Sequence, residues 1–185
     1  YVREYISSPV DQVILIRLTA SKPGSITFVA NLQGVRNTEH SNYGTDYFMM
    51  DDEQPNALVL RGRSADYLGV PSRMKHYCRL QAYAEGGTVS VDGINLRVSG
   101  ADAATLVFAA ATNFVRYDDV TGNPRKRVKD RLARLTGKSY EQMKSDHVAE
   151  HQRLFRRLSI DLGTSDAGKL PTDERIRKFS AHSDP

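Results

Sequence analysis

The feature that most constrains the fold is a change in the spacing of apolar residues near Tyr117. Before this point, apolar and polar residues alternate in short runs separated by turns, which is the period of a β-strand. After it, apolar residues recur every three or four positions, which is the period of an amphipathic helix. The chain is therefore predicted to be mainly β, with helices after the β region.

Seven or so antiparallel strands with short turns are expected, and this pattern is typical of a β-sandwich. The Ser21–Gly24 turn predicts that the strands on either side of it pair as a hairpin. The Asp92-Gly93 pair predicts a second hairpin with a type I′ turn. The expected strands lie at Gln12–Thr19, Ser25–Asn31, Ala57–Gly62, 75–85, 89–91, 94–98 and 101–114.

Two parts of the β region need separate comment. The polar stretch Gln33–Pro55 is longer than a hairpin loop, so it is expected to be an excursion with structure of its own. The predicted strand 75–85 has two different faces. One face carries Tyr77, Arg79, Gln81 and Tyr83, and the other carries Cys78, Leu80 and Ala82. Cys78 is the single cysteine, which excludes an internal disulfide, and it is expected to be a buried small hydrophobe.

Two helices are expected after the boundary segment "DDVTGNP". Asn123 is placed as the N-cap of the first, with Pro124 at its first position. Val128, Leu132 and Leu135 form its apolar stripe, and Gly137 ends it. Ser139 and Gln142 then form a capping box for the second helix. The stripe of that helix is expected to face inward and comprises Tyr140, Met143, His147, His151, Leu154 and Leu158.

The apolar period falls to two at Leu158, where Leu158, Ile160 and Leu162 alternate with polar residues up to Gly163. This predicts that a helix gives way to an extended segment. A third helix is expected near the end, with Thr172 as its cap and Ile176 and Phe179 facing inward.

Charge is concentrated in one segment. The 185 residues have a net charge of +4, but residues 123–158 contain eleven Lys and Arg against four Asp and Glu. "RKRVKDRLAR" (125–134) has no interleaved aromatic residue and no surrounding nucleic-acid-binding motif. A solvated helix face, or a face docked on an acidic partner domain, explains it better. No apolar run approaches the roughly 20 residues that a membrane helix needs.

The one metal-site pattern is "HVAEH" (147–151). His147 and His151 lie one turn apart, which allows both imidazoles to bind one zinc ion with Glu150 as a base. No metal-binding pattern nearby supplies a third ligand, and Asp161 and Glu174 are named only because they could provide a carboxylate. The alternative is that both histidines lie on the inward stripe and form hydrogen bonds there.

Other patterns that suggest chemistry have simpler explanations. The acid pairs at 51–52 and 118–119 are explained by turn formation, and Gly86-Gly87 is a turn because no helix follows it. No serine has the sequence context of a nucleophile elbow. No residue is therefore assigned a catalytic, ligand-binding or metal-binding role, and no cofactor is expected.

Four stretches in order make the chain resemble one family. They are "REYISSPVDQVILIRLTASKPGSITF", "EGGTVSVDGINLRVSGADAATLVFAAATNF", "DHVAEHQRLFRRLSIDLG" and "LPTDERIRKF". They resemble the N-terminal region of glycoside hydrolase family 95, the inverting α-L-fucosidases, from Arg3 to about Asp184. The segment Gln33–Arg73 is the least similar part.

The resemblance implies a partial sandwich at 1–117, lacking strands at its N-terminus, and a helical linker at 118–163. Residues 164–185 are then a tail leading toward an (α/α)₆ catalytic barrel. In the family, a Glu acid and an Asp base in that barrel perform the inversion. This chain is accordingly expected to be a non-catalytic part that supports the barrel, its basic segment facing an acidic or polar surface there. The resemblance also implies fucosylated glycans as ligands of the parent, in an extracellular or periplasmic location, and self-association through exposed strand edges.

The alternative function is a stand-alone carbohydrate-binding sandwich. In that case tyrosine side chains on the surface stack on sugar rings, and the candidates are Tyr43, Tyr47, Tyr77 and Tyr83.

Overall fold

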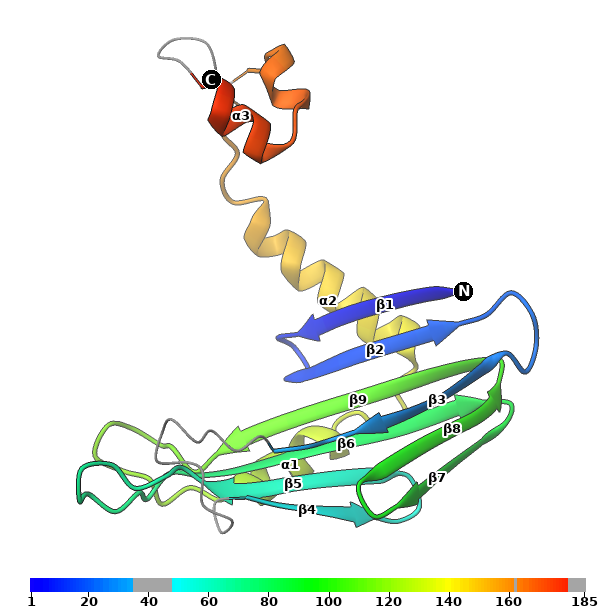
Figure 1. Cartoon of the computed structure of the whole chain (residues 1–185), viewed down its shortest axis with the longest axis vertical. Coiled ribbons are helices and arrows are strands. Elements are labelled where there is room, and N and C mark those ends of the chain that lie inside the picture. Colours follow the sequence, from blue (N-terminus) through cyan, green and yellow to red (C-terminus); the bar gives the residue numbers. More distant parts are fainter. Residues whose placement is uncertain (35–47, 162, 180–185) are drawn as a thin grey trace. The chain divides into compact units, whose positions relative to one another are not determined.

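The computed structural model describes residues 1–34, 48–161 and 163–179 (Figure 1). Tyr1–Glu150 form one compact unit, and the chain from His151 onward forms a second. Among these residues, no helix has the length and apolar character required to cross a membrane.

A six-stranded antiparallel sheet is the centre of the first unit. Its strands lie in the order β1-β2-β9-β6-β5-β4. A second sheet of three antiparallel strands has the order β3-β8-β7. The strands are β1 (Val2–Ser8), β2 (Val13–Thr19), β3 (Ile26–Asn31), β4 (Phe48–Glu53), β5 (Ala57–Arg63), β6 (Lys75–Glu85), β7 (Thr88–Asp92), β8 (Asn95–Ala101) and β9 (Ala103–Thr112).

The two sheets pack face to face, which confirms the predicted β-sandwich. β7 and β8 lie against β4, β5 and β6. The core between the sheets contains Leu58 and Leu80 from the large sheet and Leu96 and Val98 from the small one. The face of the six-stranded sheet that points into this core is its inner face, and the opposite face is its outer face.

The predicted hairpin across Ser21–Gly24 is wrong. β2 pairs with β1 and β9, whereas β3 pairs with β8 in the other sheet, so the chain crosses between sheets here. Asp102 stabilises the crossing: its Oδ1 accepts a 2.7 Å hydrogen bond from the Gly24 amide, and its carbonyl accepts one from Ala20. Asp102 also joins β8 to β9 across the sheets, so two crossings meet at one residue. The turn signal was present, but it does not specify which strand is the partner.

The acid pair at 51–52 is also placed differently from the prediction. Asp51 and Asp52 belong to β4, at the edge of the six-stranded sheet, and Asp51 pairs with Arg61 of β5 at 3.1 Å. The rest of the predicted excursion, 35–47, lies outside the described residues. The later hairpin turn is centred on Gly93 and Ile94, one residue further on than predicted, because Asp92 pairs with Asn95.

Two helices follow the sandwich, as predicted. α1 (Pro124–Ala133) begins after Asn123, whose side chain accepts a hydrogen bond from the Lys126 amide. α2 (Tyr140–Phe155) begins after Ser139, whose Oγ accepts one from Gln142 at 3.1 Å. α2 ends at Phe155, three residues before the predicted switch at Leu158.

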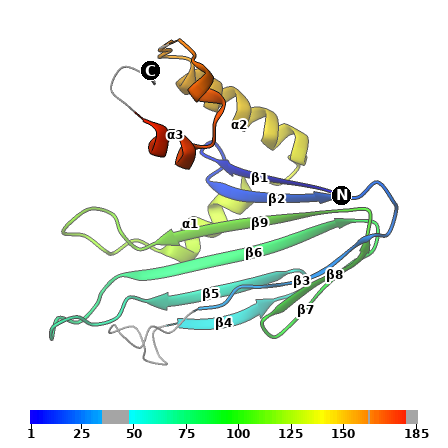
Figure 2. The ribbon, with the colours of Figure 1, turned by 45° about the horizontal axis from the view of Figure 1, so that its top comes forward.

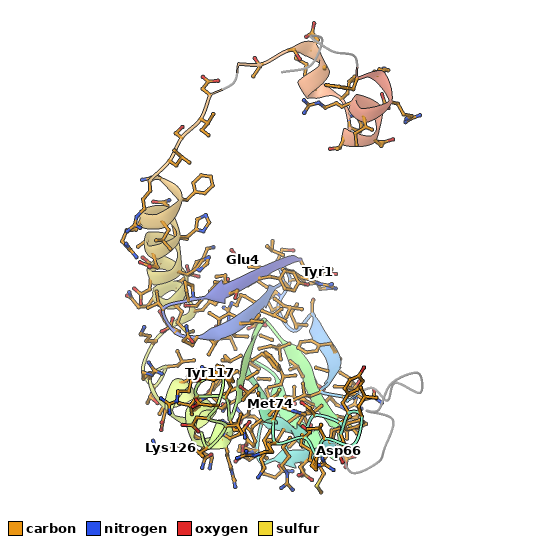
Figure 3. All side chains as sticks on the ribbon, turned by 90° about the vertical axis from the view of Figure 1, so that its left-hand side faces the viewer. Tyr1, Glu4, Asp66, Met74, Tyr117 and Lys126 are labelled. Atoms are coloured by element: carbon orange, nitrogen blue, oxygen red, sulfur yellow. The ribbon has the colours of Figure 1, made fainter. Side chains whose placement is uncertain are left out.

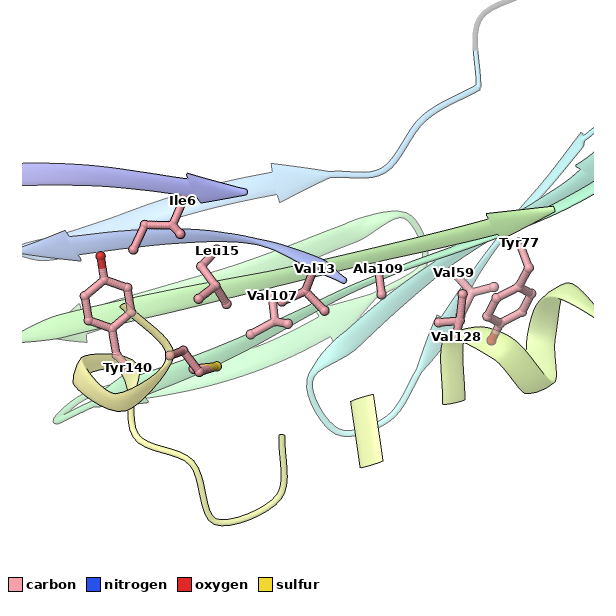
Figure 4. Packing of buried hydrophobic residues seen from close by; sticks show 10 residues of the cluster. Ile6, Val13, Leu15, Val59, Tyr77, Val107, Ala109, Val128 and Tyr140 are labelled. Atoms are coloured by element: carbon pink, nitrogen blue, oxygen red, sulfur yellow. The ribbon is translucent and has the colours of Figure 1, made fainter. Parts of the chain in front are cut away.

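α1 and the first turn of α2 pack on the outer face of the six-stranded sheet, which adds a third layer to the first unit (Figures 1 and 2). Val128 of α1 and Tyr140 and Met143 of α2 are buried against this face. Figure 4 shows them beside Ile6, Val13, Leu15, Val59, Tyr77, Val107 and Ala109 of the sheet. β6 contributes to both cores, as its alternation predicted: Tyr77 faces the helices and Leu80 the small sheet. Cys78, expected to be buried, is only partly so.

The second unit contains η3 (Asp166–Lys169) and α3 (Thr172–Lys178). Thr172 is the first residue of α3 rather than its cap, because Pro171 occupies the cap position. Ile176 and Phe179, predicted to face inward, are 71% and 64% exposed. Leu162 lies outside the described residues.

Candidate functional site

The outer face of the six-stranded sheet carries the polar and apolar contacts that hold α1 and the start of α2. α1 is fixed there by its basic residues, which donate to main-chain carbonyls at the end of β9. Arg127 donates to the carbonyls of Thr112 and Phe114 at 2.9 and 2.6 Å, and Arg131 to that of Ala110 at 2.5 Å. Part of the basic segment therefore docks on the sandwich of the same chain.

Asn113 connects three loops beneath the start of α1. It is 3% exposed. Its Oδ1 accepts from the Lys75 amide at 2.7 Å, and its Nδ2 donates to the carbonyls of Arg73 and Val120 at 2.9 and 2.6 Å. A buried amide with this many partners is a structural junction, because each of those backbone groups would otherwise be unpaired. This role was not predictable from the sequence, since Asn113 stands in an ordinary strand-to-loop position.

The first turns of α2 are held by what we call the α2 anchor, a set of charged and aromatic residues from β1, β2 and the α2 region. Lys138 Nζ lies 2.8 Å from Asp11 Oδ1 and 3.1 Å from Asp146 Oδ2. Asp11 is buried and also accepts from Ser8 Oγ at 3.1 Å. The members are Glu4, Asp11, Arg17, Lys138, Tyr140, Lys144 and Asp146.

The second half of the α2 anchor surrounds Tyr140. Glu4 lies on β1 (Figure 3). Lys144 donates to its carboxylate, and this hydrogen bond lowers the pKa of Glu4. Burial, followed by the negative charge of Glu4, raises the pKa of Tyr140 to about 12. The Arg17 guanidinium lies 5.4 Å from the Tyr140 ring centroid and 2.7 Å from Glu85 Oε1. The α2 anchor thus combines a cation–π contact with several ion pairs.

The carboxyl groups on this face are poorly suited to act as a general acid. The acid of a glycoside hydrolase needs a raised pKa so that it carries a proton near neutral pH. Here the hydrogen bond from Arg17 lowers the pKa of Glu85, and that from Lys144 lowers the pKa of Glu4. Every described carboxyl group with a displaced pKa is displaced downward, the others being Asp66, Asp119 and Asp146.

An open groove of about 540 Å³ lies on the outer face between α1 and the β4 edge. Val59 and Tyr77 are buried at its floor, and Asp51, Arg61 and Arg125 are on its rim. Tyr77, proposed from the sequence as a sugar-stacking ring, is only 4% exposed, so its ring face is covered. Tyr83 is exposed, and Tyr43 and Tyr47 lie outside the described residues.

Within residues 1–34, 48–161 and 163–179, no third ligand joins the predicted zinc pair. His147 and His151 both lie on α2, and His151 stacks on Phe155 with ring centroids 5.4 Å apart. No group of three His, Cys, Asp or Glu suited to a metal ion gathers in the part of the chain that the structure describes. The inward stripe ends earlier than predicted, since Met143 is buried and Leu154 is 47% exposed.

Comparisons with known proteins divide the chain in two. Residues 1–117 match the family described as "Glycosyl hydrolase family 65, N-terminal domain", and residues 139–185 match "Glycosyl hydrolase family 95 catalytic domain". The chain is similar to Alpha-L-fucosidase 2 of Arabidopsis thaliana, with 28% identity over 203 residues. That alignment covers 100% of this chain and 24% of the relative, so the chain spans about a quarter of the relative's length.

The resemblance to family 95 is therefore confirmed, and the matches relate the chain to a larger glycoside hydrolase with a catalytic domain. The chain belongs to the glycosyl hydrolase family 65 N-terminal domain family, and it is an N-terminal region of the kind found in glycoside hydrolase family 95.

Proposed function

We propose that this chain is the non-catalytic N-terminal region of an inverting α-L-fucosidase-like glycoside hydrolase and that it supports the catalytic domain. The observation that carries the proposal is that the match to the catalytic domain overlaps in sequence with the compact unit that contains the sandwich. The match to the catalytic domain begins at Ser139, whereas Tyr140 and Met143 are buried in the core of the unit that begins at Tyr1. A catalytic domain whose first helix is partly built into the sandwich takes its orientation from the sandwich.

The electrostatics of the α2 anchor support this role. Glu4 is paired with Lys144, and Asp11 and Asp146 are paired with Lys138, and these ion pairs fix the helix to the sandwich. In the proposed enzyme, the proton donor and the water-activating base belong to the barrel, where the two carboxyl groups face each other across the sugar.

The test compares hydrolysis of an aryl α-L-fucoside by two proteins: the 185-residue chain and a longer polypeptide that also carries the catalytic domain. The chain alone is expected to be inactive and the longer polypeptide active. Tyr140→Ala in the longer polypeptide is expected to lower the unfolding temperature of the catalytic domain, while Tyr117→Ala, at a fully exposed loop tyrosine (93% exposed), serves as the control. Hydrolysis by the chain alone, or equal unfolding temperatures for the two variants, contradicts the proposal.

The exposed basic residues of α1 extend the proposal. Lys129 of α1 and Arg134 at its C-cap are exposed, whereas Arg127 and Arg131 donate to carbonyls of the sheet and Arg125 borders the groove beside Tyr77. We propose that Lys129 and Arg134 face an acidic or polar surface of the catalytic domain. Reversing Lys129 and Arg134 to Glu in the longer polypeptide is expected to reduce its stability and leave that of the 185-residue chain nearly unchanged. Equal stability of the reversed and parent polypeptides excludes this contact.

The groove beside α1 favours glycan binding as a second candidate function. Its apolar floor is bordered by the Asp51–Arg61 ion pair, and planar charged side chains of this kind bind pairs of sugar hydroxyls. Binding of methyl α-L-fucoside to the 185-residue chain, measured by saturation-transfer NMR and lost in Arg61→Ala, supports it. Absence of transfer at millimolar sugar removes it.

A further inference from the structure

A pocket of about 400 Å³ lies on the outer face of the six-stranded sheet, where the connection between α1 and α2 passes over β2, β9 and β6. We call it the Tyr83 pocket. Its lining residues all belong to the first unit, and none of them lines the groove beside α1. The volume falls within the range of about 300–1,000 Å³ that is usual for small-molecule sites. The sheet and the α1–α2 connection thus border a separate space of ligand size.

The floor of the Tyr83 pocket is one row of side chains across three strands. Arg17 of β2 lies opposite Thr105 of β9, and Thr105 lies opposite Tyr83 of β6. Glu85 follows two residues after Tyr83 on β6 and therefore projects from the same face. Because each of these residues stands on a strand rather than on a loop, the row is held rigidly before any ligand arrives.

The polar end of this row is an ion pair that offers both donors and acceptors. Arg17 Nη1 donates to Thr105 Oγ1 at 2.8 Å and lies 2.7 Å from Glu85 Oε1. Both contacts use Nη1, and a guanidinium also carries N–H donors on Nε and Nη2. The Glu85 side chain is 66% exposed, and the hydrogen bond from Arg17 lowers its pKa, so its oxygens accept from a ligand at neutral pH. A fixed guanidinium beside a carboxylate matches two neighbouring hydroxyl groups, one as acceptor and one as donor.

The rest of the Tyr83 pocket is apolar. The Tyr83 ring lines it and is 52% exposed, so the ring is accessible to a ligand. Tyr140 and Val107 lie on this face of the sheet (Figure 4). The apolar side chains that complete the lining are Val107, Leu132, Leu135, Tyr140 and Met143. An accessible aromatic ring beside aliphatic side chains suits a ligand surface made of C–H groups.

The charges around the pocket are balanced. Arg17 is paired with Glu85, and Lys138 is paired with Asp11 and Asp146. An ionised ligand would have to displace one of these partners and leave it unpaired, which is costly for a partly buried charge. The pocket therefore favours a neutral ligand with hydroxyl groups on one edge and C–H groups on one face.

We propose that the Tyr83 pocket binds a neutral pyranose, as one residue of a glycan. One face of the sugar ring stacks on Tyr83, and two neighbouring hydroxyls bind the Arg17–Glu85 pair. This gives Tyr83 the sugar-stacking role considered from the sequence, whereas the ring of Tyr77 is buried. The inference requires neither the catalytic domain nor the groove beside α1, so its failure is distinguishable from failure of the function proposed above.

The experiment is a titration of the ¹⁵N-labelled 185-residue chain with methyl β-D-galactoside, followed by amide chemical shifts. Saturable shifts are expected for Tyr83, Glu85 and Gly137, which line the pocket. The amides of Asp51 and Arg61, in the groove beside α1, are expected to stay unchanged. Methyl β-D-galacturonide, which has a carboxylate in place of the CH₂OH group, is expected to bind more weakly because Glu85 repels it.

Two variants test the contacts. Tyr83→Ala is expected to weaken binding by about tenfold, because it removes the stacking surface. Glu85→Gln is expected to weaken binding several-fold, because it removes the charged acceptor. The matched control is Tyr5→Ala, which removes a tyrosine of similar exposure (64%) from the inner face of the same sheet and is expected to leave binding unchanged. Thermal unfolding checks that all three variants are folded.

Five outcomes overturn the proposal. Two are the absence of saturable shifts at the highest soluble sugar concentration and shifts confined to the groove beside α1. Tighter binding of the galacturonide identifies an anion site instead of a sugar site. Equal affinities of Tyr83→Ala and Tyr5→Ala place the sugar elsewhere. In the longer polypeptide, Tyr83→Ala is expected to reduce saturation transfer to the galactoside, and no reduction contradicts the proposal, because the catalytic domain then covers the pocket.

Discussion

The apolar side chains of the helical segment up to Met143 and those of the segment from Leu154 onward have opposite surroundings. In the first, Val128, Tyr140 and Met143 are buried in the core on the outer face of the sheet. In the second, Phe155, Leu158 and Ile160 are at least 70% exposed. An apolar pattern thus identifies side chains that can be buried, but a partner must be present before the burial occurs. Two basic residues of the first segment, Arg127 and Arg131, also have carbonyl partners on the sandwich.

The largest expected effect tests the junction that positions the first segment. Asn113→Ala leaves the Lys75 amide and the carbonyls of Arg73 and Val120 without their side-chain partner. The free energy of unfolding is expected to fall by about 3 kcal/mol or more. Urea unfolding followed by circular dichroism measures this, and a loss below about 1 kcal/mol contradicts the role given to Asn113.

The comparison is tested most directly within α2. Met143→Ala removes a side chain that is 5% exposed, and the expected loss of stability is about 2–3 kcal/mol. Leu154→Ala, in the same helix at 47% exposure, is expected to change stability by less than about 0.5 kcal/mol. Urea unfolding of both variants measures the difference, and equal losses contradict the division of the helix.

A smaller effect is expected from the basic residues of α1. Arg127→Ala removes hydrogen bonds to the carbonyls of Thr112 and Phe114 and is expected to cost about 1 kcal/mol. Lys129→Ala, two residues away on the exposed side, is expected to be neutral. Thermal unfolding compares the two variants, and equal behaviour indicates that docking of α1 does not depend on these bonds.

The smallest effect concerns pH. The pKa of Glu4 lies below its usual 4.5 because Lys144 donates to it, so its contribution to stability is present above pH 4.5 and is lost as the pH falls through the lowered pKa. Glu4→Gln is therefore expected to be less stable than the parent chain at neutral pH and equally stable in strong acid. The control is Glu174→Gln, at an exposed i,i+4 pair of α3. A stability gap for Glu4→Gln that does not vary with pH contradicts this account of the α2 anchor.

The sequence predicted the fold where both periodicity and burial are strong. The strands β2, β5, β6 and β9, the Asn123 and Ser139 caps and the change to helices all follow from local patterns. β1 and β4 were not identified as strands, because edge strands have one paired side and keep a mixed, exposed composition. The Ser21–Gly24 turn was identified, but local sequence does not determine whether the next strand pairs in the same sheet.

Little of the candidate site was predictable, because its contacts join residues distant in sequence. Lys144 pairs with Glu4 and Lys138 with Asp11, and no spacing rule relates these positions. The excess of basic residues in 123–158 was visible in the sequence. It was assigned to a solvated helix face or to a surface docked on another domain, whereas Arg127, Arg131, Lys138 and Lys144 contact the chain's own sandwich.

Hydrogen exchange along α2 tests the central claim, which is that support from the sandwich ends partway through this helix. The account predicts slow exchange of the amides that follow Met143 and exchange faster by about tenfold or more for those near Leu154. Equal protection from Met143 to Leu154 in the 185-residue chain contradicts it, because the sandwich then stabilises the whole helix.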